Sequence, residues 1–240
     1  MKTELHKADS RGKQDHGWLK ANHTFSFGGY YNPSRVHFGT LRVLNDDYVQ
    51  GGMGFGMHPH ANMEIITIPL SGELHHKDSM GNFGAIRKGE IQVMSAGTGV
   101  EHSEFNGSET EPVTLLQIWV IPSKLNVEPR YDQLSILENQ SENKFQQIIS
   151  PNPDDDGSWI YQDAWFHLGY FSGGKDISYQ LKKNGNGVYL FLISGIIYVN
   201  GTEMSSRDGL AISETEFIEI KVIDNAEILL MEVPMQLPKI

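Results

Sequence analysis

Short runs of β-branched and aliphatic residues, separated by clusters of Gly, Asn, Asp and Pro, recur along most of the chain. Runs of this length between turn-forming residues are typical of β-strands. Segments of ten or more residues with helical periodicity are hard to find. The pattern therefore predicts an all-β fold, a sandwich or a barrel. The runs lie at residues 38–49, 64–74, 89–94, 113–121, 178–181, 187–193, 195–199, 217–222 and 226–233.

Length and composition allow two domains. A chain of 240 residues can hold one large or two ordinary domains, and 39% hydrophobic with 20% charged residues describes a globular protein. Residues 126–153 are rich in Asn, Gln, Ser, Glu and Pro, which predicts a boundary there. A faint repeat, in which Gly195 and Gly209 echo Gly72 and Gly89, leaves a duplication open. The predicted division is residues 1–130, a linker at 131–156, and residues 157–240.

The composition also excludes several kinds of site and partner. Thirty acidic against nineteen basic residues give a net charge of -11, and we see no basic patch, so we expect no direct nucleic-acid binding. The absence of cysteine rules out disulfides and thiolate metal sites and suits a reducing compartment, so we expect a cytoplasmic protein. The longest apolar runs are far shorter than the roughly 18 residues of a bilayer span, and the first ten residues are polar. We therefore expect neither a membrane anchor nor a signal peptide.

Two short histidine-containing pairs have the spacing of metal ligands. His58 and His60 flank Pro59, and Glu104 follows His102 by two residues. On a strand this spacing puts both side chains on one face, with α-carbons about 6.5 to 7 Å apart, so two such pairs on neighbouring strands can converge on one ion. Three imidazoles and a carboxylate suit Fe(II), Mn(II), Ni(II), Cu(II) or Zn(II), and an octahedral ion would keep two open positions. A single His-x-His pair, however, needs no metal.

A wider set of residues resembles the two sequence motifs of the cupins. Two departures from the cupin motifs are similar to the pirin family. Ser95 stands where the second motif usually has proline, and the gap from Gly97 to His102 is two residues longer than in that motif. The resemblance covers residues 14–121 strongly and the rest weakly. The cupin-like residues are Gly52, His58, His60, Glu64, Gly72, Gly89, Gly97, His102 and Asn106, and the further pirin-like motifs are HGWL at 16–19, HTFSF at 23–27, residues 30–33, DSMGN at 78–82 and QVMSAGTGVEHSE at 92–104.

The resemblance implies a bicupin, two tandem β-barrel domains with one metal site in the N-terminal barrel. By the family pattern the metal ligands are His58, His60, His102 and Glu104. Glu104 is also favoured over Glu64 by distance, because four strand residues span roughly 13 Å and two only about 7 Å. Glu64 remains a candidate partner for the free N–H of a ligating imidazole, and His75 and His76 are expected to be polar turn residues. Equivalent positions in the second half hold no imidazole, which predicts a metal-free C-terminal barrel; they are Leu181, Lys183, Val222 and Asp224.

The implied activity is that of a metal-dependent dioxygenase of the quercetinase type. A flavonol and dioxygen would be the substrates, the central heterocycle would be cleaved, and carbon monoxide would leave. Fe(II) is the expected ion, with Zn, Mn, Ni and Cu as alternatives, and Glu104 is the expected base. The aromatic residues Phe25, Phe27, Tyr30 and Tyr31 are expected in the barrel core, where some could line a cavity for a flat substrate.

Two other interpretations use the same ligands. The first is a metal-containing, redox-sensitive regulatory protein that docks a transcription factor, a role that the pirin resemblance also implies. The acidic balance argues against direct contact with DNA but permits a protein partner. The second is a hydrolase or isomerase that uses a zinc-bound water. The sequence leaves both open.

Overall fold

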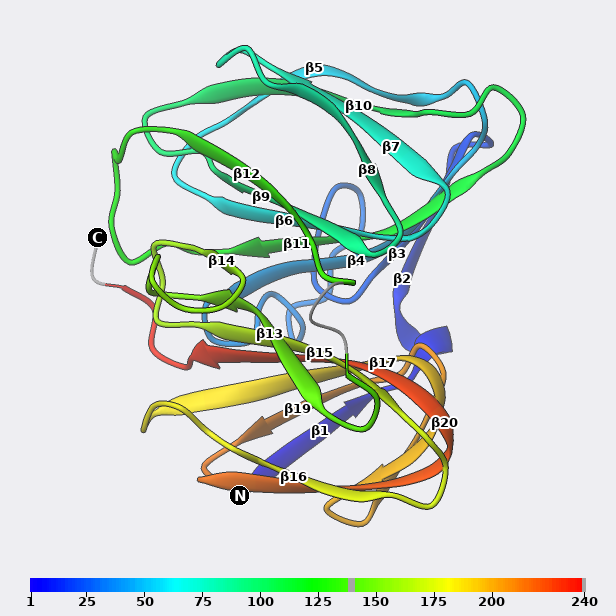
Figure 1. Ribbon diagram of the computed structural model, residues 1–240, viewed down its shortest axis with the longest axis vertical. Coiled ribbons are helices and arrows are strands. Elements are labelled where there is room, and N and C mark those ends of the chain that lie inside the picture. The colour runs from blue at the N-terminus through cyan, green and yellow to red at the C-terminus, as the bar shows by residue number, and fades with distance from the viewer. Residues whose placement is uncertain (138–140, 239–240) are drawn as a thin grey trace.

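Strands make up nearly all the regular structure of the protein. The computed structural model describes residues 1–137 and 141–238, and within them the one helix is a single 3-10 turn, η1, at Ala8–Ser10 (Figure 1). This confirms the all-β prediction. The first twelve strands are β1 (Lys2–His6), β2 (Gly12–Asp15), β3 (Leu19–His23), β4 (Leu41–Val49), β5 (Gly54–His60), β6 (Glu64–Ser71), β7 (Glu73–Asp78), β8 (Phe83–Arg87), β9 (Glu90–Ser95), β10 (Val100–Asn106), β11 (Val113–Val120) and β12 (Arg130–Ser135). They are followed by β13 (Phe145–Ser150), β14 (Ser158–Trp159), β15 (Trp165–Phe171), β16 (Asp176–Gln180), β17 (Asn186–Val199), β18 (Thr202–Ser205), β19 (Gly209–Ser213) and β20 (Phe217–Pro234).

The first barrel consists of two facing sheets. A seven-stranded sheet has the order β12-β9-β6-β11-β4-β3-β2, and a four-stranded sheet has the order β5-β10-β7-β8. Figure 1 shows the smaller sheet at the top of the molecule, above the larger one. Buried side chains from both sheets meet between them, for example Val49 and Leu115 from the larger sheet with Leu74 and Ile86 from the smaller. This double layer encloses the histidines discussed below.

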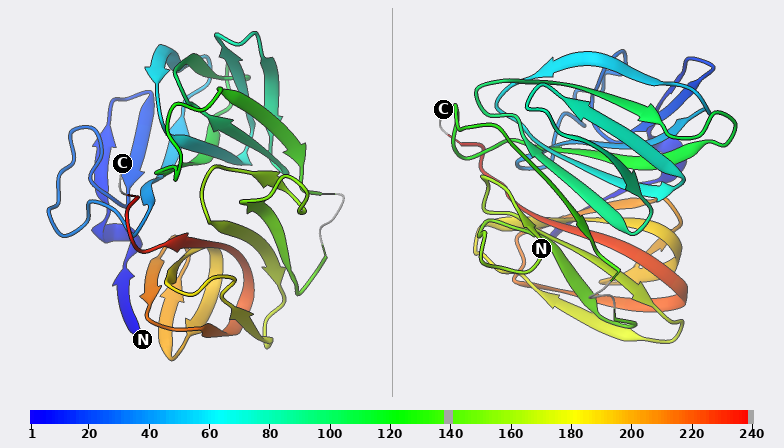
Figure 2. Two further views of the ribbon diagram at one scale, coloured as in Figure 1. Left: turned by 90° about the vertical axis from the view of Figure 1, so that its left-hand side faces the viewer. Right: turned by 45° about the horizontal axis from the view of Figure 1, so that its top comes forward.

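The second barrel is one strongly curved nine-stranded sheet. Its main path runs β1-β19-β17-β20-β15-β13-β14, and the two long strands β17 and β20 also pair with β18 and β16. Apolar side chains fill its interior, among them Leu190, Ile218 and Leu230. The two views of Figure 2 show the two barrels packed against each other. A pair of cupin barrels is the predicted fold, and it is confirmed.

A third layer of apolar side chains joins the barrels. Leu44 and Leu116 point from the outer face of the seven-stranded sheet toward Phe166 and Leu229 of the second barrel. The larger sheet is therefore buried on both faces. Such strands lose the alternation of polar and apolar residues, and residues 64–69 of β6 are accordingly all buried.

The ends of the chain cross between the barrels. Strand β1 pairs with β19 in the second barrel, whereas β2, which follows soon after, belongs to the first. Near the other end, the Pro234 carbonyl accepts a 2.9 Å hydrogen bond from the backbone N–H of Thr40. We retain the division at residues 1–130, 131–156 and 157–240 as a proposal. In this division, β1 belongs by sequence to the N-terminal domain but pairs with a strand of the second barrel. The linker contains most of β12 and all of β13. Residues 138–140 and 239–240 of that division lie outside the described residues.

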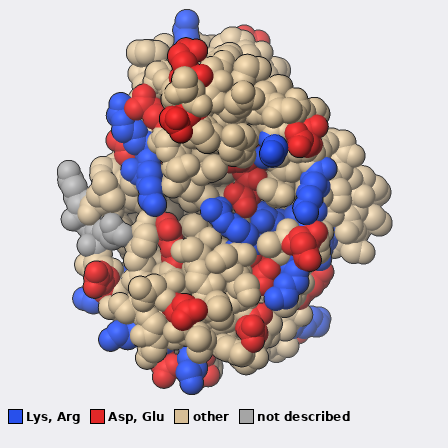
Figure 3. Space-filling view, turned by 90° about the vertical axis from the view of Figure 1, so that its right-hand side faces the viewer, with Lys and Arg blue, Asp and Glu red and all other residues tan. Residues whose placement is uncertain are grey.

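The surface shows no segregation of charge on the face drawn in Figure 3. Lys and Arg side chains lie there beside Asp and Glu side chains. Over the part of the chain that the structure describes, no helix has the length and hydropathy needed to traverse a bilayer.

Candidate metal centre

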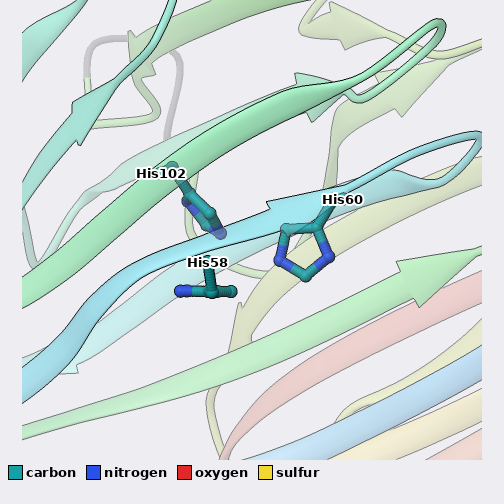
Figure 4. Close-up of side chains that lie close together, drawn as sticks. All are labelled: His58, His60 and His102. Atoms are coloured by element: carbon teal, nitrogen blue, oxygen red, sulfur yellow. The ribbon is translucent and has the colours of Figure 1, made fainter.

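Strands β5 and β10 bring three imidazoles together inside the first barrel. The two strands are antiparallel neighbours in which His102 lies opposite His58 and Val100 lies opposite His60. Figure 4 shows His58 and His60 on β5 facing His102 on β10. Ring centroids are 4.4 Å apart for His58 and His102 and 4.9 Å apart for His60 and His102. One ring nitrogen from each histidine lies within 4.8 Å of the other two, so a single ion can contact all three.

The turn that leads into β10 depends on Gly97. Its φ of +46° is in the left-handed region, and a Cβ at this position would lie 2.1 Å from the Val127 carbonyl oxygen. Glycine meets both demands because it has no Cβ. A β-bulge then lies between His102 and Glu104, after which Glu104 is opposite Phe55. Bulges of this kind re-aim side chains next to functional sites.

The protonation and hydrogen bonding of the imidazoles fit a metal. Burial, together with the neighbouring His58, lowers the pKa of His102 to about 3 and that of His60 to about 4, so both rings are neutral near pH 7. His58 Nδ1 is 2.8 Å from the Gly56 carbonyl oxygen and donates to it, which leaves Nε2 as a lone-pair donor. Both ring nitrogens of His102 are buried and have no hydrogen-bond partner among the described residues. A ligand to one of them would satisfy a group that is otherwise costly to bury.

Glu104 occupies the next inward-facing position of β10 after His102. Its ligand oxygen falls in a second group with His76 and His102, again within 4.8 Å of one another. The four predicted ligands therefore fall in two groups that share His102, and the second group also contains His76. Thr67 Oγ1 donates to Glu104 Oε1 at 3.3 Å, and Gln117 Nε2 donates to Oε2 at 3.1 Å. Burial raises the pKa of Glu104, opposed by the nearby imidazoles and these hydrogen bonds.

His76 is the site residue that the sequence interpretation placed wrongly. His75 and His76 belong to strand β7 rather than to a turn. His76 is fully buried, hydrogen-bonds Asp78 Oδ2 at 3.0 Å through Nε2, and stacks on Tyr131 with centroids 4.8 Å apart. Alternation along β7, where Leu74, His76 and Asp78 are the buried residues, was the available signal.

Glu64 hydrogen-bonds a residue outside the imidazole cluster. Its carboxylate accepts a 2.6 Å hydrogen bond from Ser95 Oγ, and burial raises its pKa to about 7. Ser95 is the residue that replaces proline in the cupin-like motif, so this departure provides a donor for a buried carboxyl group. Glu64 thus contacts β9 rather than a ligating imidazole.

A cavity of about 380 Å³ opens on the imidazoles. Of the aromatic residues expected at such a cavity, Phe27 lines it, whereas Phe25 is buried between the barrels and Tyr31 is exposed. Trp119 stands edge-on to His60, with ring centroids 4.9 Å apart. Besides His58, His60, His102 and Glu104, the lining residues are Gln14, Leu19, Ala21, His23, Phe27, Asn45, Asp47, Phe55, Gly56, Ile65, Gln117 and Trp119.

A row of polar side chains crosses the seven-stranded sheet beneath this cavity. Strand register aligns Thr67 with Gln117, Gln117 with Asn45, and Asn45 with His23. His23 Nδ1 is 2.8 Å from Asn45 Oδ1, and its Nε2 is 3.0 Å from Gln14 Oε1. No sequence signal identifies Thr67, Asn45 or Gln117, because single polar residues inside apolar strands form a recognisable row only when the strand order is known.

Two stacked cupin barrels, with a cluster of imidazoles inside the first, define a metal-binding bicupin. The family comparisons agree with this class. A family model described as Pirin matches residues 4–120, and one described as Quercetinase C-terminal cupin domain matches residues 147–233. The chain belongs to the pirin family.

Relatives resemble this chain over its full length. A protein of Escherichia coli strain K12 named quercetin 2,3-dioxygenase is 40% identical over 230 residues, which cover 96% of this chain and 98% of the relative. The crystal structure of YhhW from Escherichia coli covers 100% of both chains at 38% identity, with a TM-score of 0.93. A second structure, of bacterial pirin YhhW in complex with nickel(II), has a TM-score of 0.92 at 39% identity and covers 97% of this chain and 99% of that one.

Proposed function

We propose that this protein is a metal-dependent dioxygenase of the quercetinase type, which uses dioxygen to cleave the central heterocycle of a flavonol and releases carbon monoxide. The observation that carries the proposal is the convergence of three imidazoles on a cavity with aromatic walls. The relatives named quercetin 2,3-dioxygenase support it, because the likeness to them extends over almost the whole chain.

His58, His60, His102 and Glu104 are the proposed ligands of one divalent ion. Nitrogen and oxygen donors without sulfur suit Fe(II), which we propose as the native ion, and also Mn, Ni, Cu and Zn. The nickel(II) complex of the E. coli relative supports a site for a divalent transition metal. When bound, the ion would supply a site for dioxygen chemistry and increase the acidity of a flavonol hydroxyl. The cytoplasm remains the proposed compartment, since a chain without cysteine suits reducing surroundings.

Glu104 is the residue that we assign as the base. It accepts the proton of the flavonol 3-hydroxyl, and its burial raises its pKa, so it is a stronger base than an exposed carboxylate. The hydrogen bonds from Thr67 and Gln117 fix the orientation of the carboxylate. Because both donors come from the opposite sheet, the reactive carboxylate is held across the interior of the barrel.

The cavity walls provide a surface for a flat aromatic substrate. Phe27 packs edge-on against Trp119 with centroids 5.3 Å apart, and Trp119 in turn contacts His60. Leu19 and Ile65 add apolar surface. A ring system that enters the cavity would displace water from around Glu104. Burial of its apolar surface would contribute about 25 cal/mol per Å² to the binding free energy.

The test combines metal analysis with turnover. Protein purified without added metal is assayed by elemental analysis, and loss of the flavonol absorption band is then followed under air and under nitrogen. We expect oxygen-dependent loss of the band with one carbon monoxide released per turnover. His102→Ala should lose both metal and activity, and Glu104→Gln should reduce turnover about 10²- to 10⁴-fold. The control is His75→Ala, since this half-buried side chain pairs with Glu73 rather than with the site. Full flavonol cleavage by a metal-free variant, or none by iron-loaded wild type, would contradict the proposal.

A further inference from the structure

Strand β4 carries two neighbouring aspartates that point in opposite directions. Asp46 faces the second barrel, where it pairs with Arg11 and Arg207. Asp47 faces the interior of the first barrel and lines the cavity with the imidazoles. Alternation along a strand explains the difference. Asp46 is neutralised by two cations, whereas Asp47 is not paired within the described residues.

The carboxyl group of Asp47 is buried, and no described residue donates a hydrogen bond to its Oδ1. The residue is 6% exposed, and its Oδ1 has no partner among the residues that the structure describes. Burial raises its pKa well above the usual range for aspartate, and the charges of Asp46 and Glu104 add to this effect. A buried polar group that lacks a protein partner requires an explanation. A hydroxyl group of a bound molecule would supply the missing donor.

Asp47 lies beside the metal centre but outside it. Neither group of converging ligand atoms found in the described chain includes it. In the sheet register, Asp47 lies opposite Leu115 and Ala21, two residues along the strands from the Gln117–Asn45 row that reaches Glu104. Two strand residues correspond to about 7 Å. Asp47 is therefore placed to contact a part of the substrate away from the reacting carbon atoms.

Two other polar side chains of this wall, His23 and Trp119, do not offer a free acceptor. His23 is hydrogen-bonded to Asn45 and Gln14 on its two ring nitrogens. Trp119 Nε1 is also buried without a partner in the described part of the chain, but an indole N–H can only donate. Of the cavity-lining atoms that are buried without a partner in the described residues, the Asp47 carboxyl oxygen is thus one that can accept from a substrate hydroxyl.

We propose that Asp47 accepts a hydrogen bond from a hydroxyl group of the substrate other than the 3-hydroxyl, and so makes the cavity selective for polyhydroxylated flavonols. The proposal rests on the proposed function, because it assumes a flavonol in this cavity. Sites that hydrogen-bond a hydroxyl reject analogues lacking it, since the buried acceptor is then left unpaired. Asp47 is in this sense a substrate-binding residue that determines specificity, while Glu104 remains the base.

The test is a binding experiment under nitrogen, in which no turnover occurs. Quercetin and the flavonol whose only hydroxyl is at position 3 are titrated into the Fe(II)-loaded full chain. Wild type should bind quercetin about 10-fold or more tightly than the monohydroxylated flavonol, the effect of one hydrogen bond to a buried group. Asp47→Leu removes the acceptor at similar volume and should reduce this preference to about 3-fold or less, with the affinity for the monohydroxylated flavonol unchanged. Asp47→Asn keeps a carbonyl acceptor and should retain most of the preference.

Controls separate recognition from folding. Tyr48→Phe changes the next residue of β4, whose side chain contacts Lys20 outside the cavity, and should leave both affinities unchanged. Metal content and melting temperature are measured for every variant. If Asp47→Leu does not fold, Asp47→Ala gives the same comparison, because it removes the acceptor without adding volume.

The possible outcomes distinguish failure of the Asp47 proposal from failure of the proposed function. If Asp47→Leu keeps the full preference for quercetin, or loses affinity for both flavonols equally, Asp47 does not recognise a hydroxyl, and the proposed function is unaffected. If iron-loaded wild type binds neither flavonol, the proposed function is wrong and the role of Asp47 is wrong with it. Selective loss of quercetin affinity supports both.

Discussion

The ion pairs of Asp46 provide the sharpest test of how the two barrels are held together. The Asp46 carboxylate lies 3.3 Å from Arg11 Nη2 and 3.0 Å from Arg207 Nη1. Arg11 belongs to the segment between β1 and β2, and Arg207 to the second barrel. The Arg11 side chain is only 4% exposed. Asp46→Ala would therefore leave a buried guanidinium without its carboxylate.

The magnitude follows from that burial. Removing one partner of a buried ion pair costs about 3–5 kcal/mol, because the remaining charge is uncompensated. Arg207 is one-third exposed, so water replaces its partner and it contributes little. For a chain of this length each kcal/mol lowers the melting temperature by roughly 2–4 °C. Multiplying the two ranges gives an expected decrease of roughly 6–20 °C.

The assay is urea unfolding together with thermal melting, with metal content as a second readout. Lys2→Ala is the control, because the Lys2–Glu214 pair is short, at 2.6 Å, but its side chains are 74% and 59% exposed; its removal should cost less than about 1 kcal/mol. The double variant Asp46→Ala, Arg11→Met should recover most of the loss, since no buried charge remains. Metal content should not change. An Asp46→Ala variant within about 1 kcal/mol of wild type, or a double variant no better than the single, would refute the reasoning.

Two further predictions concern buried carboxyl groups. The pKa of Glu64 is raised from 4.5 to about 7, so the native state binds its proton more tightly than the unfolded state, and stability should fall as pH rises between these values. Glu64→Gln should lack this pH dependence. Its free energy of unfolding, measured in urea, should therefore increase relative to that of wild type by about 3 kcal/mol between pH 4 and pH 8, at 1.36 kcal/mol per pKa unit. Glu232 is fully buried and accepts hydrogen bonds from Tyr179, Asn186 and two backbone N–H groups. Glu232→Ala should destabilise the protein by about 3–5 kcal/mol without changing metal content, and a loss below about 1 kcal/mol would show that water satisfies these donors.

The sequence was sufficient to predict site residues whose shared face depends only on the backbone of one strand. The i, i+2 spacing of His58 with His60, and of His102 with Glu104, puts each pair on one face whatever its neighbours are. The same alternation also marks His76, although its position soon after Gly72 suggests a turn. The strand-like runs between turn-forming residues were sufficient to predict an all-β fold, and the pirin-like motifs were sufficient to predict two cupin barrels.

Residues that act between strands were decided by the tertiary structure alone. Glu104 is held by Thr67 and Gln117, which are 37 and 13 residues away in the chain, and the structure places the orphaned carboxyl group of Asp47 in the same cavity. The physical reason is that side-chain direction along a strand follows from local backbone geometry, whereas strand order and register depend on how distant apolar faces pack. The sequence by itself therefore determined the class of fold and the pairs of candidate ligands. Only the packed barrels determined that those pairs meet, which donors orient the carboxylate, and that β1 joins the second barrel.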